Sequence, residues 1–335
     1  MVGLSKKLFS DDEWSIMKAI TLSQFGGPEV LELSEVPDPV AAEGEVLIDV
    51  VAVGLNRADV QQCRGFYPPP DGASEYLGLE VSGRIAQSGH GFTRGQEVVG
   101  LLAGGGYAEQ IAVPAGQVIP VPDGVELVDA AGLPEVAATV YSNVVMAAGL
   151  SAGETLLVHG GAGGIGAMAI QLGKAWGARV IATAGSAEKC ATVLALGADE
   201  AINYREQDFV EVAHQYRGAN VILDVMGGSY LSRNMDALAL NGRLVIIGLQ
   251  DGATAELNLG ALMGKRASVI GTTLRARPVA EKSAIMSRVQ AEVWPLVARG
   301  VVKPNSDTTF PLAQASEAHE YFDSGKHQGK ILLTI

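Results

Sequence analysis

The stretch ETLLVHGGAGGIG, residues 154–166, joins an apolar run to three glycines in the spacing GxGxxG. TLLVHG predicts a buried strand and AMAIQLGKAWGA, after it, a helix, with a second strand at RVIATA. In a dinucleotide-binding turn of this kind the first glycine permits the bend, the second lets the backbone approach a pyrophosphate, and the third lets the helix pack on the sheet. Helix N–H groups then face the phosphates. The candidate contacts are Gly161, Ala162, Gly163, Gly164, Ile165 and Gly166; the alternative is a glycine-rich βα turn without a ligand.

The end of the second strand indicates which nucleotide binds. NAD enzymes usually place an acid there, on the ribose 2′-hydroxyl, and residues 182–187 contain none. The turn offers a small residue, a hydroxyl and a cation, which suit a 2′-phosphate. We therefore expect NADPH as cofactor, held at this corner by Gly185, Ser186, Lys189 and Tyr204. The alternative is that Ser186 caps the next helix, Lys189 is solvated and Tyr204 packs an edge.

Strands and helices alternate across residues 134–275, which predicts a doubly wound, six-stranded parallel sheet in a Rossmann domain. Residues 17–133 show short β-type runs between glycine and proline turns and predict a mostly antiparallel barrel. Residues 279–299 have helical spacing, and KILLTI forms a last strand. We expect 276–335 to return to the barrel, so that the Rossmann domain is an insertion and the cofactor lies in the cleft between the domains. Residues 1–16 are expected to be a flexible extension.

Composition excludes several classes of partner. The chain has 335 residues, a formal net charge of -13 and only two cysteines. An acidic chain without a basic block is not expected to bind nucleic acid, and no segment supplies the roughly 20 apolar residues of a membrane helix. Without a signal-like start or a cysteine framework, a reducing, cytoplasmic setting is expected. The last parallel strand, residues 267–273, should lie at an open sheet edge, which favours a homodimer.

Longer blocks carry a family resemblance. They are GLNRADVQQCRGFYPPPDGASEYLGLEVSG at 54–83, AGGGYAEQ at 103–110, LPEVAATVYSNV at 133–144, LDVMGGSY at 223–230 and TLRARP at 273–278. From residue 17 to the end the chain resembles the medium-chain dehydrogenase/reductase superfamily, and within it the zinc-free quinone oxidoreductases of the zeta-crystallin group. It is most similar there to the tumour-suppressor-inducible quinone oxidoreductase branch. The resemblance implies a GroES-like barrel carrying the Rossmann insertion and an NADPH-dependent reduction of quinones or other α,β-unsaturated carbonyls, which are small-molecule substrates.

The zinc enzymes of this superfamily place a cysteine and a histidine where this chain has Asn56 and Leu79. Glu80 alone cannot supply the three protein ligands of a catalytic zinc. The structural-zinc cysteines are also missing, because no cysteine lies between Cys63 and Cys190. We therefore expect no bound metal, with Glu80 as an internal hydrogen-bond partner.

Without a metal, hydrogen-bond donors must stabilise the charge that hydride transfer creates on a carbonyl oxygen. Asn56, in the lost metal-ligand position, and Tyr67, on the loop RGFYPPP, are the candidate catalytic residues. Their plain alternatives are an asparagine that holds its own turn and a ring that walls the pocket. By the same resemblance, contacts to the cofactor are expected from Asn56 and from Thr139, Gly248, Leu249, Arg275 and Lys330; solvated cations are the alternative for the last two.

Two other functions remain open. One is an enoyl-thioester or acrylyl-CoA-type reductase, because related branches use a tyrosine on this loop as proton donor. The other is a non-catalytic NADPH-binding protein, as in the relatives recruited into the eye lens.

Overall fold

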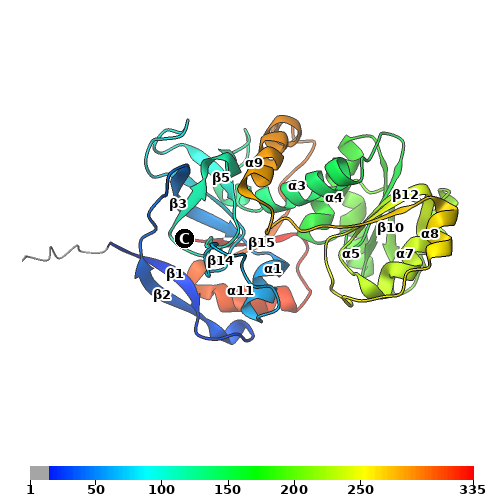
Figure 1. Cartoon of the computed structure of the whole chain (residues 1–335), viewed down its shortest axis with the longest axis horizontal. Helices are drawn as coiled ribbons and strands as arrows, with labels where there is room; N and C mark the ends of the chain where they lie inside the picture. The colour runs from blue at the N-terminus through cyan, green and yellow to red at the C-terminus, as the bar shows by residue number, and fades with distance from the viewer. Residues whose placement is uncertain (1–14) are drawn as a thin grey trace, which may run out of the picture.

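Six parallel strands form one end of the molecule (Figure 1), in a computed structural model that describes residues 15–335. Their order is β10-β9-β8-β11-β12-β13, so the chain moves outward from β8 in one direction and from β11 in the other. The carboxyl ends of β8 and β11 therefore frame the topological switch point, where such sheets bind ligands. The strands are β8 (Thr155–Val158), β9 (Arg179–Ala184), β10 (Glu200–Asn203), β11 (Ala219–Asp224), β12 (Leu238–Ile246) and β13 (Ser268–Gly271).

Helices cover both faces of this sheet, which is why its central strands are apolar throughout. Leu156 and Val158 face one layer, whereas Leu157 faces the other, as the two-residue period of a strand requires. The first layer contains α4 and α5, and the second contains α6 and α7. The helices are α4 (Gly164–Ala175), α5 (Ala187–Ala195), α6 (Phe209–Gln215), α7 (Leu231–Ala237) and α8 (Leu259–Lys265).

The other end of the molecule contains a seven-stranded sheet in which every pairing is antiparallel except that of β14 with β15. A separate hairpin of β1 and β2 lies beside it (Figure 1). The mostly antiparallel architecture is as predicted. The strands are β1 (Ile16–Leu22), β2 (Leu31–Pro37), β3 (Glu45–Gly54), β4 (Glu80–Ile85), β5 (Glu97–Leu101), β6 (Gln110–Pro114), β7 (Val118–Pro120), β14 (Ser306–Pro311) and β15 (Lys330–Thr334).

Two helical segments connect the ends of the molecule. The first begins at Pro134, whose fixed φ suits a first helical turn, as α3 (Pro134–Val140), and continues as π-helix to Ala147. The second comprises α9 (Val279–Arg288), a π-helical turn and α10 (Trp294–Ala298). Both contribute to one apolar cluster, in which Val99 and Leu101 of β5 join Val140, Met286 and Val158. The core is thus continuous between the two sheets, and the division at residues 134 and 276 stays a prediction.

The C-terminal segment has more structure than the sequence analysis predicted. The strand β14 and the helix α11 (Ala315–Asp323) precede β15. Because β15 pairs with β3, the chain returns to the seven-stranded sheet. The short helices α1 (Arg57–Cys63) and α2 (Leu127–Ala130) complete the set. Apart from its last two positions, the extension predicted at residues 1–16 lies outside the described residues. Among residues 15–335, no helix combines the length and apolar character needed to cross a bilayer.

Candidate active site

A cleft of about 850 Å³ opens at the carboxyl ends of the parallel strands. The glycine turn after β8 forms its floor, and the segment Ser324–Gly329, just before β15, forms part of its opposite wall. Eleven of the residues predicted from the sequence line it: Asn56, Ala162, Gly163, Gly164, Ile165, Gly166, Gly185, Ser186, Lys189, Tyr204 and Lys330.

The structure assigns the bend of the turn to a different glycine than the sequence predicted. The left-handed residue of the turn is Gly160 (φ 72°), so the tight bend lies one residue before Gly161. Gly161 is buried against Ala182 and does not line the cleft. A Cβ on Gly166 would overlap the Gly160 carbonyl oxygen, which gives that glycine the expected packing role. At Gly163 only the Gly160 oxygen, 3.6 Å away, would meet a Cβ, so this face is open to a ligand.

The start of α4 is suited to an anion. Gly163 occupies the N-cap position with extended backbone (φ -83°, ψ 173°), and within residues 15–335 no side chain caps the first-turn N–H groups. Uncapped N–H groups and the positive end of the helix dipole together favour a phosphate.

The four residues predicted at the 2′-phosphate corner come together. A Cβ on Gly185 would lie 2.6 Å from the Tyr204 hydroxyl oxygen. The Ser186 hydroxyl accepts from the Lys189 amide at 3.2 Å, so the serine caps α5 and still has its own proton to donate. The Lys189 ammonium donates to the Gly325 carbonyl at 2.6 Å. No carboxylate of β9 enters this corner, since the strand ends in Ala184.

His159 supports the glycine turn from below. Its Nε2 lies 2.7 Å from Asn234 Oδ1 and its Nδ1 3.2 Å from the Thr183 hydroxyl, which in turn accepts from the Gly160 amide. Burial lowers the pKa of this histidine to about 4, so the ring is neutral. The ring packs against Phe209 and Tyr230, so His159 stabilises the fold rather than acting as an acid.

Asn56 does not present a free amide to the cleft. Its Nδ2 donates to the Gly54 carbonyl and to Glu80 Oε1, both at 3.0 Å, and its Oδ1 accepts from Lys330 Nζ at 2.7 Å. Because a lysine only donates and a carboxylate only accepts, these contacts determine the orientation of the amide. The amide is thus engaged within the protein, as in the alternative of an asparagine that holds its own turn, and the predicted role of Asn56 as oxyanion donor stays a prediction.

Lys330 lines the cleft, and its ammonium is paired within the protein rather than solvated. Its ammonium lies 2.5 Å from Glu80 Oε1 and also donates to the Leu55 carbonyl, and both side chains of the ion pair are buried. Glu80 accepts further from the Glu135 amide at 2.9 Å. Glu80 is therefore the internal partner that the sequence indicated. The Lys330 ammonium already has acceptors within the protein, and its predicted contact with the cofactor stays a prediction.

Glu135, which the sequence analysis did not select, lies beside this cluster. Its Oε1 accepts from the Thr139 hydroxyl at 3.4 Å. Burial, and next the Glu80 carboxylate, raise the pKa of Glu135 to about 8, so the group retains a proton at neutral pH. Thr139 is buried in α3 with its hydroxyl on this carboxyl group. Only the position after Pro134, at a helix start, could have drawn attention to Glu135.

The Arg275 side chain forms hydrogen bonds to three distant segments of the protein. Its guanidinium donates to the carbonyls of Ala103 at 2.7 Å and Tyr67 at 3.1 Å and to Gln62 Oε1 at 2.6 Å, and it is 3% exposed. It also lies 5.4 Å from the centre of the Tyr67 ring. These donors are engaged within the protein and tie Arg275 to the Tyr67 loop, and the predicted cofactor contact stays a prediction.

The Tyr67 hydroxyl, by contrast, makes no hydrogen bond within residues 15–335. Burial raises the pKa of Tyr67, as does the nearby Glu135, so the phenol remains protonated and can donate. Gly248 packs on Val225 at the end of β11, and Leu249 is exposed beside Gly227. Neither is part of the cleft wall, although the next residue, Gln250, is.

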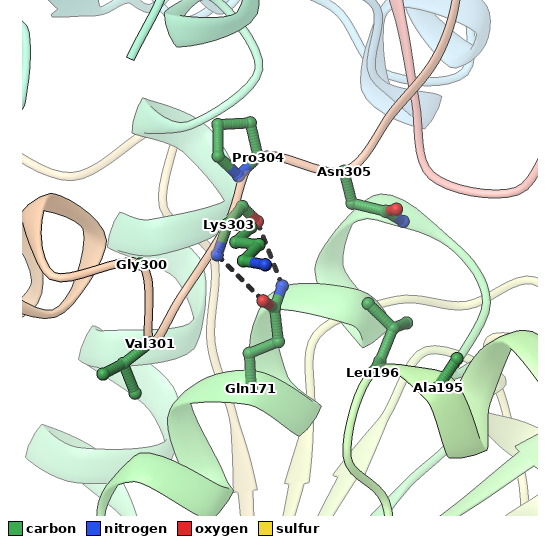
Figure 2. Close-up of a pocket in the computed structure, with 8 residues that line it drawn as sticks. All are labelled: Gln171, Ala195, Leu196, Gly300, Val301, Lys303, Pro304 and Asn305. Atoms are coloured by element: carbon green, nitrogen blue, oxygen red, sulfur yellow. Dashed lines mark hydrogen bonds between the residues drawn. The ribbon is translucent and has the colours of Figure 1, made fainter. Parts of the chain in front are cut away.

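The described residues contain no group of three or more histidine, cysteine, aspartate or glutamate side chains arranged to hold a metal ion. A second cavity, of about 380 Å³, lies where residues 300–305 meet α4 and α5. Figure 2 shows Gln171 there, bonded in both directions to the backbone of Lys303 (Nε2 to O 3.1 Å, N to Oε1 2.9 Å). These bonds join a linker to a helix, and we assign this cavity no ligand.

Comparisons with known proteins agree with this architecture. Residues 42–123 match the alcohol dehydrogenase GroES-like domain, and residues 164–290 match the zinc-binding dehydrogenase family. Human quinone oxidoreductase is 31% identical over 329 residues, covering 96% of this chain and 98% of that protein. The structure of Escherichia coli quinone oxidoreductase complexed with NADPH superposes with a TM-score of 0.84 at 31% identity, over 95% of this chain and 100% of that chain.

An enoyl reductase, CurK, has the same fold: its structure gives a TM-score of 0.83 at 26% identity and covers 95% of this chain and 99% of that chain. The finer placement in the tumour-suppressor-inducible branch stays a prediction. With identity above 30% over nearly the whole chain, a glycine turn at the switch point and both domains matched, the chain belongs to the quinone oxidoreductases of the medium-chain dehydrogenase/reductase superfamily.

Proposed function

We propose that this protein is an NADPH-dependent reductase that transfers a hydride to quinones or other α,β-unsaturated carbonyls without a metal ion. One observation carries the coenzyme assignment: Ser186, Lys189 and Tyr204 meet at the end of β9, in the cleft that begins at the glycine turn. A hydroxyl, an ammonium and a phenol suit a 2′-phosphate, and an aspartate there would repel it.

The residues present fit NADPH along its length. The uncapped start of α4 and the open face of Gly163 would take the pyrophosphate. The corner at Gly185 would take the 2′-phosphate. The cleft continues to Leu55 and Asn56, where the nicotinamide would lie. When bound, NADPH supplies the hydride, and the chemistry left to the protein is orientation, exclusion of water and control of a proton.

The proton comes, in this proposal, from Tyr67. Hydride addition leaves negative charge on the acceptor's carbonyl oxygen, and a donor directed at that oxygen lowers the barrier. The Tyr67 phenol is protonated and uncommitted, whereas both Asn56 N–H groups are engaged. Asn56 would then act by holding Lys330 and Glu80 under the cleft, and Arg275 by anchoring the Tyr67 loop.

An acceptor panel tests the function. Oxidation of NADPH and NADH is followed with a quinone, an enone and an enoyl-CoA, with wild-type protein and Tyr67→Phe. We expect preference for NADPH and turnover of the quinone and enone. Tyr67→Phe should lower kcat on the enone about a hundredfold while the NADPH Kd stays within about twofold, because one such donor is worth about this much. Tighter binding of NADH, or tight NADPH binding without turnover of any acceptor, would contradict the proposal.

The second candidate is an enoyl-thioester reductase, and the similarity to CurK favours it. That function requires room for a coenzyme A or carrier-protein arm at the Tyr67 loop, none of whose residues lines the 850 Å³ cleft. A kcat/KM for enoyl-CoA at least tenfold above that for every quinone would select this function.

Zinc independence is tested directly. Metal analysis of the purified protein should find well under one zinc per chain, and dialysis against a chelator should leave turnover unchanged. The support is chemical: Asn56 and Leu79 stand where the zinc enzymes have ligands, and Glu80 is already paired with Lys330. Stoichiometric zinc whose removal abolishes turnover would refute it.

We further propose a cytoplasmic homodimer joined through β13. This strand is at the edge of the parallel sheet, and α8, which precedes it in the chain and contacts β12, has no fully buried side chain. Leu259 and Met263 are 63% and 76% exposed on that helix. An open edge with apolar side chains next to it suits pairing with a second copy.

A further inference from the structure

Thr183, near the end of β9, binds two successive amides of the glycine turn. Its carbonyl accepts from the Gly161 amide at 2.8 Å, and its hydroxyl accepts from the Gly160 amide at 3.3 Å. The side chain is 2% exposed, at the wall of the cleft. The neighbouring strand therefore fixes both peptide planes that flank Gly160, the left-handed residue of the turn.

The hydroxyl of Thr183 continues a chain of hydrogen bonds away from the turn. A hydroxyl that accepts from Gly160 still has its own proton to donate. His159 Nδ1, 3.2 Å away, accepts this proton when the ring carries its hydrogen on Nε2, and Asn234 Oδ1, 2.7 Å from Nε2, accepts in turn. The partners thus select one tautomer of the ring. The hydrogen bonds run in one direction, from the Gly160 amide through the hydroxyl and the imidazole to Asn234 of α7.

This chain is closed to water. His159 and Asn234 are both buried, and burial lowers the pKa of His159 to about 4, so the neutral tautomer persists at neutral pH. Removal of one member is costly, because each buried group left behind has neither a protein partner nor water to replace it.

The Gly160 peptide also supports the start of α4. Its carbonyl accepts from the Gly163 amide at 3.1 Å, and a Cβ on Gly166 would overlap the same oxygen. Of the turn's amides, those of Gly164, Ile165 and Gly166 at the helix start have no acceptor within residues 15–335 and remain for a ligand. Because the first turn of the helix rests on the Gly160 carbonyl, a rotation of that peptide would change the direction of these amides.

We propose that Thr183 and His159 are positioning residues of the coenzyme site, which hold the Gly160 peptide at the angle that directs the first-turn amides of α4 at a phosphate. Neither side chain binds the phosphate itself. The inference rests on the proposed NADPH-dependent function and adds to it the groups behind the glycine turn, as far as α7.

Three ligands separate the turn from the rest of the cleft. 2′-AMP has only the phosphate expected at the corner of Ser186 and Lys189, 2′,5′-ADP adds a phosphate at the glycine turn, and NADPH adds the nicotinamide half. Their Kd values are measured by calorimetric titration of wild type, Thr183→Val and Thr183→Ser. Valine keeps the shape of threonine without the hydroxyl, whereas serine keeps the hydroxyl.

Thr183→Val should weaken the binding of NADPH and 2′,5′-ADP about tenfold, because the Gly160 amide and His159 Nδ1 lose their partner, and should leave the Kd of 2′-AMP within about twofold. Thr183→Ser should stay within about threefold of wild type for all three ligands, since the hydrogen bonds are retained. In turnover, Thr183→Val should raise the KM for NADPH without lowering kcat, because the loss is in the binding of the coenzyme and not in the transition state alone.

A second variant tests the chain beyond Thr183. His159→Phe keeps a ring to pack against Phe209 and Tyr230 and removes both nitrogens. It should weaken 2′,5′-ADP and spare 2′-AMP in the same way. The double variant with Thr183→Val should bind 2′,5′-ADP no more weakly than the weaker single variant, because both changes interrupt one chain.

An equal loss for 2′-AMP and 2′,5′-ADP in Thr183→Val, or an unchanged Kd for both, would overturn the inference, as would additive losses in the double variant. If one single variant does not fold, the other gives the same comparison of the two ligands. These results leave the proposed function standing, whereas wild-type protein that bound neither NADPH nor 2′,5′-ADP would end both proposals.

Discussion

Glu80 and Lys330 form a buried ion pair, in which each charge would destabilise the fold if it were buried alone. Burial of either charge alone is strongly unfavourable, and the pair offsets that cost through a short contact and the bonds to Asn56 and Leu55. The sequence indicated an internal role for Glu80 but not its partner, and it predicted Lys330 as a contact to the cofactor.

Lys330→Met should therefore destabilise the protein by about 3 to 5 kcal/mol, because it leaves the Glu80 carboxylate buried without a counter-ion. Adding Glu80→Gln should recover a large part of this loss. Urea denaturation of the two single variants and the double variant gives the coupling free energy between Glu80 and Lys330. A loss below about 1 kcal/mol in Lys330→Met would show that the ion pair is not buried as described.

Glu135 makes stability depend on pH. Its pKa, about 8, is above the ordinary glutamate value, so the folded state holds this proton more tightly than the unfolded state. The resulting stabilisation is complete below the unfolded pKa and is lost as the pH rises through 8. Glu135→Gln should thus match wild type near pH 4 and have a Tm about 2 to 6 °C higher at pH 9, as 1 to 2 kcal/mol would give.

Thermal unfolding from pH 4 to pH 9 measures this difference, with Glu317→Gln on the exposed face of α11 as the control. The control should follow wild type throughout. A Glu135→Gln curve parallel to that of wild type would show that the carboxyl group is ionised at neutral pH.

Among the single elements, the start of α4 contains two glycines with different roles, one in packing and one at the open cleft. Gly166 has no room for a Cβ because the Gly160 carbonyl is there, whereas Gly163 is open toward the cleft. Sequence spacing predicted both glycines correctly as part of the turn, but it placed the bend at Gly161 instead of Gly160, since these two adjacent glycines cannot be ranked without the backbone angles.

Gly163→Ala and Gly166→Ala are a matched pair. Gly166→Ala should lower the free energy of unfolding by about 1 to 3 kcal/mol, because the helix must shift away from the turn. Gly163→Ala should leave stability within about 0.5 kcal/mol and weaken NADPH binding at least tenfold, since the methyl group occupies the space of the pyrophosphate. Urea denaturation measures the loss of stability, and NADPH titration measures the loss of affinity. A stability loss in Gly163→Ala and an affinity loss in Gly166→Ala would contradict the roles given to the two glycines.

The elements themselves were predictable to different degrees. The strands β8, β9 and β11 are continuous apolar runs, and the sequence placed them within a few residues. By contrast β14, with the sequence SDTTFP, is polar and mostly exposed at a sheet edge, so no apolar pattern distinguished it. Its pairing with β15 is a tertiary contact.

For the whole molecule, the exposed side of α8 and β13 determines assembly in our proposal. Met263→Glu should raise the dimer dissociation constant at least tenfold by placing a charge in the interface. Met146→Glu, also at an exposed methionine but on the helix that follows α3, is the control and should not change it. Sedimentation velocity over a micromolar concentration series measures both variants. A wild-type monomer throughout, or equal effects of the two substitutions, would remove β13 as the interface.

Local sequence patterns predicted the parallel sheet, the antiparallel partner sheet, the glycine turn and the corner at Ser186, Lys189 and Tyr204. These depend on local periodicity and on neighbours within one strand-turn-helix unit. The contacts of Asn56, Arg275 and Lys330, by contrast, could be known only once the chain had folded. Asn56 and Lys330 are 274 residues apart in the chain, and Arg275 and Ala103 are 172 apart. Such contacts arise from the pairing of β3 with β15 and from the packing of distant loops, which no local pattern encodes.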